Sequence, residues 1–390
     1  MKKLIHSFSV VISITLVTAC YGMKEYPAPG ANQISQYKSL IEGKRVAVIA
    51  NQTSMVGKTH LVDTLLSLGI RINAIFAPEH GFRDLADAGQ PIENGMDAET
   101  GIPLISIYGS HLKPTPEDLN GIDVVIFDIQ DVGTRFYTYI STLHYVLEAC
   151  AENNVRCIVL DRPNPNGFYF DGNIADTLYR SFVGLDPVPV VHGMTVGEYA
   201  QMLNGEGWLK NRVRCDLTVI KCTNYTHKTY YELPVKPSPN LPNQTSVYLY
   251  PSLCFFEGTK ISVGRGTAFP FQVYGSPELP DTGFSFTPES VPGAKNPPFI
   301  GQKCFGKDLR NAFKDQIMPP SKINLDWVID AYRNYPEKNK FFTSYFDVLA
   351  SGPMLREQIR DGMTSDEIRA TWREGLKKFG KIRAKYLLYP

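Results

Sequence analysis

A glutamate that follows an apolar run is the residue best suited to acid–base chemistry in this chain. It is Glu79, which stands between Pro78 and His80. The proline fixes the backbone before the carboxyl group and Gly81 permits a sharp turn after it, so the side chain can be directed into a cleft. We therefore predict that Glu79 is a general acid or base, with His80 holding it or acting on its own. The structural alternative is a helix cap or a salt bridge to Arg83.

Polar side chains also follow other apolar runs. Asp128 and Asp131 come after the run at residues 124–127 and are candidate partner carboxylates, although Asp131 is also spaced to pair with Arg135 on one helix turn. Turns after strands often contain Asp and Asn for capping alone, so one polar strand end is weak evidence for a site. Four apolar runs that each end in polar residues are a stronger signal. The candidate substrate-binding residues of this half are Asn51, Gln52, Arg83, Gln130, Arg135, Tyr137, Asn164 and Asn166.

A glycine-rich segment at residues 256–267 contains Glu257 and an arginine, Arg265, with a glycine on each side. The glycines let the backbone approach a ligand, and the guanidinium group suits a carboxylate. Arg265 is therefore a candidate for binding an anionic group. A tight turn without a binding role is the structural alternative.

Several functional motifs do not occur in the sequence. The nucleotide-binding patterns G-x-G-x-x-G and G-x-x-x-x-G-K-[ST] are missing, as are H-E-x-x-H, G-x-S-x-G and C-x-x-C. These absences argue against a nucleotide-binding loop, a metalloprotease, a serine esterase and a zinc knuckle. We predict no metal site, and the alternative is a metal-dependent hydrolase that uses His80, Asp128 and His192.

The elements that position these residues alternate in type. Apolar runs at residues 45–50, 72–76, 104–108, 124–127 and 157–160 are separated by helical patterns, notably at 59–68 and 141–153. This alternation predicts an α/β fold with a mostly parallel sheet that is covered on both faces. Because ligands bind beyond the carboxyl ends of such strands, we expect the polar residues above to meet at one edge of the sheet.

The pattern changes towards the C-terminus, where we place a second, α+β domain. A strand is expected at residues 284–287, and helices at 307–313 and 326–335. The last helix has the clearest signature: Thr364 and Glu367 form a capping box, and apolar residues then recur on one face. The predicted division is a catalytic domain at residues 37–282 and a C-terminal domain at residues 283–390.

The chain begins with an export signal. Residues 1–3 carry positive charge, and the mainly apolar stretch at 4–19 has 16 residues, too few to span a bilayer. Small residues before Cys20 resemble the signal of bacterial lipoproteins, with an ordinary cleavable signal as the alternative. We expect a signal peptide at residues 1–19, lipid on Cys20, and a tether at residues 20–36. The protein would then be an exported lipoprotein, membrane-anchored on the periplasmic or cell-surface side. The sequence does not determine whether its other six cysteines form disulfides.

Composition limits the partners. The 390 residues contain 40 Lys and Arg against 39 Asp and Glu, a net charge of +1, so there is no global field to attract nucleic acid or an acidic membrane. With 43% hydrophobic residues, this is the composition of an ordinary globular protein. The partner is expected to be small.

Five long motifs resemble the exo-β-N-acetylmuramidase family, a group of bacterial glycoside hydrolases. They lie at residues 77–83, 127–139, 160–167, 237–242 and 256–267, in that order. The resemblance implies a Rossmann-like N-terminal domain, a smaller C-terminal domain and an active cleft between them. It also implies release of N-acetylmuramic acid from the non-reducing ends of peptidoglycan fragments, without a cofactor.

Glycoside hydrolysis needs a proton donor and usually a second carboxylate. Glu79 matches the glutamate of the family motif and is assigned as the general acid/base. The second group stays open among Asp128, Asp131, Glu257 and the acetamido group of the substrate. Arg265 or Arg135 is expected to bind the lactyl carboxylate of muramic acid, and Tyr137 is expected to stack on the sugar or to pack in the core. A muropeptide-binding or sugar-binding lipoprotein without turnover is the competing class.

Overall fold

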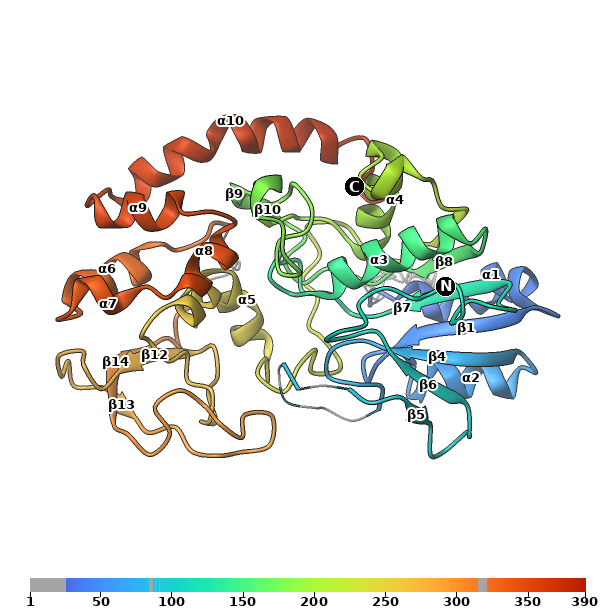
Figure 1. The fold of residues 1–390 in the computed structure, drawn as a ribbon, viewed down its shortest axis with the longest axis horizontal. Helices are drawn as coiled ribbons and strands as arrows, with labels where there is room; N and C mark the ends of the chain where they lie inside the picture. The colour runs from blue at the N-terminus through green and yellow to red at the C-terminus, as the bar shows by residue number, and fades with distance from the viewer. Residues whose placement is uncertain (1–25, 84–86, 88, 91, 315–320) are drawn as a thin grey trace, which may run out of the picture.

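The computed structural model describes residues 26–83, 87, 89–90, 92–314 and 321–390, and its ribbon forms two lobes (Figure 1). The signal peptide expected at residues 1–19, the lipidation at Cys20 and residues 21–25 of the tether lie outside the described residues. Among the helices of the described ranges, none has both the length and the hydropathy for crossing a membrane.

The N-terminal lobe is built on a seven-stranded sheet in the order β11-β8-β7-β1-β4-β6-β5. Neighbouring strands are parallel except for the edge strand β5, which is antiparallel to β6. The parallel strands follow the doubly wound order of Rossmann-type folds, which confirms the predicted α/β class. The strands are β1 (Arg45–Ala50), β4 (Arg71–Ala77), β5 (Gly95–Met96), β6 (Pro103–Ser106), β7 (Val124–Asp128), β8 (Arg156–Leu160) and β11 (Leu217–Ile220).

Helices cover both faces of this sheet. They are α1 (Ile34–Ile41), α2 (Leu61–Ser67), α3 (Tyr139–Glu152) and α4 (Val196–Glu206). On β1, Val46 and Val48 belong to the core that contains α1 and α2. Ala47 and Ile49 belong to the opposite core, which contains α3 and α4. Because successive strand residues point to opposite faces, a strand covered on both sides must be apolar throughout, as residues 46–50 are.

Two short strand pairs and the segment at residues 28–36 complete the N-terminal part of the described chain. β2 (Met55–Val56) and β3 (Thr59–His60) form a hairpin before α2, so the helix expected at residues 59–68 begins two residues later. β9 (Asp171–Ile174) and β10 (Pro189–Val191) pair antiparallel between the two lobes, close to α10. Residues 28–36 belong to the fold: Gly30 N–H donates to the carbonyl of Asp161 at 2.7 Å. The expected tether therefore packs onto the sheet over its last part.

The C-terminal lobe contains a small antiparallel sheet and most of the remaining helices (Figure 1). In this sheet β12 pairs with β14, which also pairs with β13, so strands on both sides of residue 283 share one sheet. The elements are α5 (Gln244–Leu253), β12 (Val273–Ser276), β13 (Ser285–Phe286), β14 (Cys304–Asp308), α6 (Asp326–Asn334), α7 (Lys338–Phe341), α8 (Ser344–Ala350), α9 (Met354–Arg360) and α10 (Ser365–Arg383).

The helix expected at residues 307–313 is wrong. Its first residues belong to β14, and turns follow at residues 310–314. Gly306 decides the matter, because a Cβ atom there would lie 1.9 Å from the carbonyl oxygen of Tyr274 on β12. The glycine lets the two backbones approach, so pairing of β14 with β12 prevails over the helical spacing of the apolar residues.

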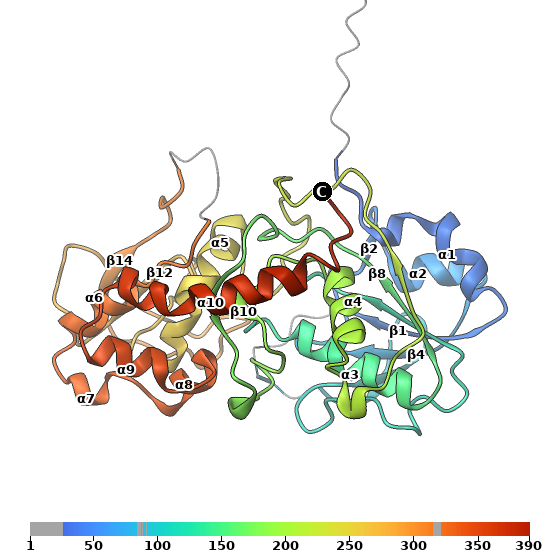
Figure 2. The same ribbon diagram turned by 90° about the horizontal axis from the view of Figure 1, so that it is seen from above.

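The last helix confirms its predicted cap and spans both lobes. The Thr364 side chain accepts from the backbone N–H of Glu367, and the capping box is complete. Figures 1 and 2 show α10 running from the C-terminal lobe towards α4. There the Tyr386 hydroxyl donates to Glu206 at 2.8 Å, and the Tyr389 hydroxyl donates to the buried Asp161 at 2.6 Å. The chain thus returns to the N-terminal lobe at its end.

The six cysteines of the described ranges are buried free thiols.

Candidate active site

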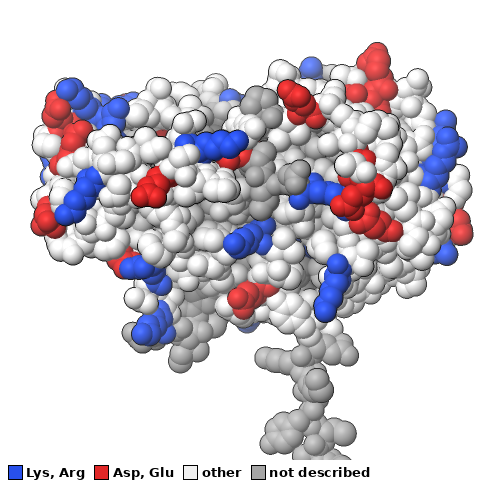
Figure 3. All heavy atoms as spheres, turned by 90° about the horizontal axis from the view of Figure 1, so that it is seen from below, with Lys and Arg blue, Asp and Glu red and all other residues white. Residues whose placement is uncertain are grey.

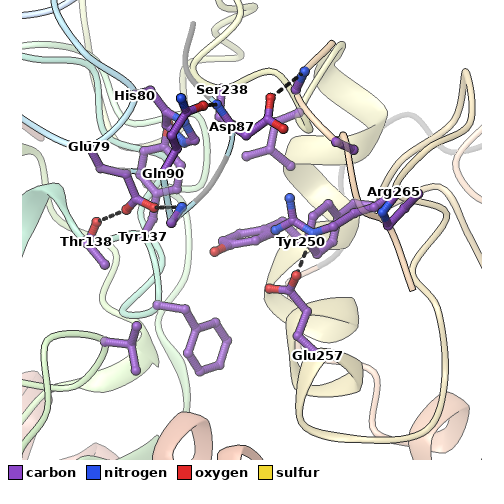
Figure 4. A pocket seen from close by; sticks show the side chains of 18 of the residues that line it. Glu79, His80, Asp87, Gln90, Tyr137, Thr138, Ser238, Tyr250, Glu257 and Arg265 are labelled. Carbon is purple, nitrogen blue, oxygen red and sulfur yellow. Dashed lines mark hydrogen bonds and ion pairs between the residues drawn. The ribbon is translucent and has the colours of Figure 1, made fainter. Parts of the chain in front are cut away.

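A cavity of about 730 Å³ lies between the two lobes (Figure 4). One wall comes from the N-terminal lobe and includes Glu79, Tyr108 and Thr138; the other includes Tyr250, Glu257 and Arg265. This volume is within the range of pockets that bind a small molecule.

Glu79 follows β4 and holds its carboxyl group in the cavity by three hydrogen bonds from neutral donors. The hydroxyl of Tyr108 donates to Oε1 at 2.9 Å, and the N–H of Gly89 donates to the same oxygen at 3.2 Å. The hydroxyl of Thr138 donates to Oε2 at 2.8 Å. Burial, followed by the neighbouring carboxylate, raises the pKa of Tyr108, so this phenol keeps its proton. The carboxyl group is thus fixed on both oxygens without a neighbouring cation among these contacts.

The turn after Glu79 has the sharp backbone that the sequence predicted. His80 has a φ of 71° and Gly81 a φ of 88°, both in the left-handed region. The backbone carbonyl of Glu79 accepts from the hydroxyl of Tyr139 at 3.2 Å, and that hydroxyl accepts from Nδ2 of Asn51 at 3.0 Å. His80 is buried and lines the cavity beside the acid. Both predicted residues of this turn therefore lie at the cavity.

Glu257 and Arg265 form an ion pair on the opposite wall. Arg265 Nε donates to Glu257 Oε1 at 2.6 Å, and the guanidinium group lies 5.1 Å from the centre of the Phe271 ring. Burial lowers the pKa of Arg265, but the Glu257 carboxylate outweighs it and the net pKa is raised. The side chains are 23% and 19% exposed, so both are accessible from the cavity. Figure 4 shows this pair facing Glu79 across the open space.

The cavity brings together Glu79, His80, Tyr137, Glu257 and Arg265 from the predicted set. The Tyr137 hydroxyl donates to the carbonyl of Pro237 at 2.6 Å, and its ring lies edge-on to Tyr139 at 4.8 Å. Half-buried Gln52 donates to the same carbonyl at 3.1 Å, so it supports the wall without lining it. These residues come from strand ends and from the glycine-rich segment, as the sequence predicted.

The structure does not bring the other two candidate carboxylates to the cavity. Asp128 is fully buried and receives two hydrogen bonds from Arg162, at 2.6 and 2.9 Å. Asp131 is buried beside His192, whose Nε2 lies 3.4 Å from Oδ2. His80, Asp128 and His192, the residues of the alternative metal site, therefore lie in three separate environments. Within the described residues, no set of His, Cys, Asp or Glu side chains is grouped to hold a metal ion.

The two remaining arginines have structural partners. Arg83 binds Asp63 at 2.6 Å and Asp97 at 3.0 Å. Arg135 is 1% exposed, and its terminal nitrogens donate to backbone carbonyls of both lobes. The acceptors are Asn173, Val188 and Leu349, at 2.8 to 3.0 Å. Neither guanidinium group is therefore available to bind a substrate in the cavity.

The predicted amides at the other strand ends are buried and bind backbone carbonyls. Gln130 donates to Pro163 at 2.8 Å, Asn164 to Met194 at 2.8 Å, and Asn166 to Val132 at 2.9 Å. They hold neighbouring loops together rather than lining the cavity, which is the capping role that strand ends favour.

Sequence reasoning missed several lining residues. Tyr108 was placed inside a strand, but β6 ends at Ser106 and Tyr108 lies beyond it. Thr138 directly follows Tyr137 in the quoted motif and could have been found there. Asp87 and Lys295 had no local signal, because their position at the cavity depends on contacts between the lobes.

Charges of both signs are interspersed on the face shown in Figure 3. Recognition of an anionic group must therefore come from individual cations in the cavity. Among the described lining residues these are Arg265 and Lys295.

Fold and cavity together define a two-lobed α/β protein with a doubly wound sheet and an acid held in a sugar-sized cavity. The chain belongs to the exo-β-N-acetylmuramidase family: "Exo-beta-N-acetylmuramidase NamZ, N-terminal" matches residues 46–245, and the corresponding C-terminal description matches residues 248–389. The resemblance drawn from the five motifs is thereby confirmed.

Relatives support this assignment over most of the chain. The peptidoglycan β-N-acetylmuramidase NamZ of Bacillus subtilis (strain 168) is 39% identical over 375 residues, which is 91% of this chain and 89% of that protein. Two crystal structures of DUF1343 family proteins from Bacteroides fragilis are similar in fold. One has a TM-score of 0.85 and 46% identity, covering 94% of this chain and 99% of its own. The other has a TM-score of 0.78 and 28% identity, covering 93% and 99%.

Proposed function

We propose that this protein is an exo-acting glycoside hydrolase that releases N-acetylmuramic acid from the non-reducing ends of peptidoglycan fragments. The observation that carries the proposal is the carboxyl group of Glu79, held at the cavity by three neutral donors. Family membership supports it, since the relative from Bacillus subtilis is named a peptidoglycan β-N-acetylmuramidase.

The neighbours of Glu79 suit a group that must carry a proton and then release it. A hydroxyl group can donate to a carboxylate and can rotate to accept from a carboxylic acid. Tyr108 and Thr138 are therefore compatible with both states of the acid. In the proposed reaction Glu79 protonates the glycosidic oxygen as the bond to the leaving sugar breaks.

Glu257 is the second carboxylate of the proposed reaction. The carboxylates among the described lining residues are Glu79, Asp87 and Glu257. Asp87 accepts from two backbone N–H groups, whereas Glu257 faces Glu79 from the opposite wall. A guanidinium group has no acceptor, so Arg265 binds Glu257 as a donor only. Glu257 then stabilises the positive charge that develops on the sugar ring.

The lactyl carboxylate of muramic acid is assigned to Arg265. The ion pair with Glu257 uses Nε, so the terminal nitrogens of the guanidinium group can bind a second carboxylate. Arg135, the other sequence candidate, is enclosed by backbone carbonyls. Tyr137 and Tyr250 both line the cavity, and their rings lie edge to face with centres 6.1 Å apart.

The direct test is incubation of the purified protein with a muramyl-glucosaminyl disaccharide, followed by mass analysis of the products. The expected products are free N-acetylmuramic acid and N-acetylglucosamine, at the same rate with and without a chelator. An intact disaccharide that binds the protein would favour the sugar-binding alternative, and loss of turnover with the chelator would favour a metal-dependent hydrolase.

We also propose that the protein is exported and held at a membrane by lipid on Cys20. The support is the sequence pattern of residues 1–20. A Cys20→Ser variant is expected to move from the membrane fraction to the soluble fraction, while its activity on the disaccharide stays unchanged. Equal distribution of the two proteins would contradict the anchor.

A further inference from the structure

A carboxylate at the cavity connects the two lobes through backbone atoms. Asp87 Oδ1 accepts from the N–H of Gly293 at 2.9 Å, and Oδ2 accepts from the N–H of Lys295 at 2.9 Å. The donors lie more than 200 residues further along the chain, in the C-terminal lobe. Two charge-assisted hydrogen bonds to one carboxylate are among the stronger contacts a surface residue can make.

The segment that Asp87 binds is itself fixed. Val291 and Ala294 exchange two backbone hydrogen bonds, at 3.2 and 3.0 Å, which closes the segment into a tight loop. Gly293 has a φ of 87°, and a Cβ atom there would lie 2.4 Å from Cβ of Pro239. Nδ2 of Asn240 donates to the carbonyl of Gly293 at 2.9 Å. The two N–H donors are therefore presented from a rigid support.

On the other side, Asp87 belongs to the same turn as one of the donors to the catalytic acid. The N–H of Gln90 donates to the carbonyl of Asp87 at 3.1 Å, and Oε1 of Gln90 accepts from the N–H of Asp87 at 3.3 Å. Within this turn, Gly89 N–H donates to Glu79 Oε1 at 3.2 Å. Hydrogen bonds thus run from Gly293 and Lys295, through Asp87, Gly89 and Gln90, to the carboxyl group of Glu79.

We propose that Asp87 is a positioning residue of the reaction: by anchoring its turn to the opposite lobe, it holds the Gly89 N–H against the carboxylate of Glu79. The inference rests on the proposed role of Glu79 as the proton donor. Asp87 itself touches backbone atoms and acts through Gly89. Its effect should therefore appear in how readily Glu79 gives up its proton.

The sign of the pH effect separates this role from a simple charge effect. If Asp87 acted through its negative charge alone, its removal would favour the carboxylate of Glu79, and activity would decline at a lower pH. If it acts by holding a donor, its removal destabilises that carboxylate, and the alkaline limb of kcat/KM moves to a higher pH. The other titratable groups that face Glu79 are unchanged in the variant. Beside it these are His80, Tyr108, Tyr137, Tyr139 and Tyr345, and across the cavity Glu257, Arg265 and Lys295.

The test compares Asp87→Ala with a matched control, using the muramyl-glucosaminyl disaccharide, whose leaving sugar needs the proton of Glu79. Asp281→Ala is the control, because exposed Asp281 also accepts from a backbone N–H, that of Gly283 at 2.8 Å, but does not line the cavity. We expect Asp87→Ala to lower kcat/KM about tenfold and to move the alkaline limb up by about one pH unit. The control should keep the wild-type profile. An unmoved limb, or one moved to lower pH, would overturn the proposal.

A neutral substitution on the opposite lobe gives an independent check. Gly293→Ala changes no charge, but its methyl group would collide with Pro239 and displace the N–H donors from Asp87. It should move the limb in the same direction as Asp87→Ala, with thermal melting confirming a folded protein. A folded Gly293→Ala protein with the wild-type profile would overturn the connection between the lobes. Failure of the wild-type protein to release muramic acid would instead refute the proposed function.

Discussion

The two walls of the cavity present a carboxyl group in opposite electrostatic settings. On the N-terminal wall, Glu79 is bound by two hydroxyl groups and one backbone N–H. On the C-terminal wall, Glu257 is bound by the guanidinium group of Arg265. A hydroxyl group can donate to a carboxylate or accept from a carboxylic acid, whereas a guanidinium group can only donate. The difference supports the proposed roles, with Glu79 of the sheet lobe as the proton donor and Glu257 of the C-terminal lobe as the negative charge.

The largest effect is expected from Glu79→Gln. Removal of the proton donor should lower kcat/KM on the disaccharide about 1000-fold, while calorimetry shows that N-acetylmuramic acid still binds. Glu257→Gln provides the comparison, and the readout is hydrolysis of the disaccharide and of a nitrophenyl muraminide, whose leaving group needs less protonation. The nitrophenyl substrate should recover part of the activity of Glu79→Gln and little of that of Glu257→Gln. The reverse pattern would exchange the two roles.

Arg265→Lys should have the next largest effect. A lysine keeps the charge opposite Glu257 but loses the fork that can bind a second carboxylate. We expect KM for a muramyl substrate to rise about tenfold, and KM for the matching glucosaminyl substrate, if it is hydrolysed at all, to change less. Steady-state kinetics on the two substrates decide the point. Equal increases in both KM values would remove the assigned contact with the lactyl group.

Tyr108→Phe is a smaller change to the N-terminal wall, with a smaller expected effect. It removes one of the three donors to Glu79 and leaves the ring in place. A fall in kcat of about fivefold is expected, because one neutral hydrogen bond is lost. Tyr230→Phe, at a 59% exposed tyrosine outside the cavity, is the matched control and should behave as wild type. A Tyr108→Phe protein with unchanged kcat would show that two donors suffice to hold the acid.

Asp128→Asn should leave catalysis unchanged and reduce stability. Asp128 is enclosed and bound to Arg162, so its neutralisation leaves a buried guanidinium group without its counter-charge. The expected loss in the free energy of unfolding is about 3 kcal/mol, measured by denaturant titration, with kcat/KM within twofold of wild type. A loss of activity without a loss of stability would return Asp128 to the list of catalytic candidates.

Much of the sheet lobe could be predicted because its signals are local. Apolar runs at residues 45–50 and 124–127 coincide with β1 and β7, and Thr364 with Glu367 marked the start of the last helix. The helix expected at residues 307–313 was wrong because its outcome depends on a glycine that meets β12, a contact distant in sequence.

The same difference between local signals and distant contacts applies to the candidate site. Glu79, Glu257 and Arg265 stand in distinctive local settings and all reached the cavity. Asp128 is the last residue of β7, but its carboxylate is bound by Arg162, which follows β8. The contact of Asp87 with residues 293 and 295 joins segments more than 200 positions apart, and no local pattern could have indicated it.

The return of the chain to the N-terminal lobe has a mechanical consequence. The chain leaves the sheet lobe before α5 and comes back after α10, where Tyr389 is bound to Asp161 and the carbonyl of Pro390 accepts from the N–H of His227. Arg135 and Asp87 also bind backbone atoms of the C-terminal lobe between these two crossings. The two walls of the cavity, with Glu79 on one and Glu257 on the other, are therefore held in register before any substrate binds.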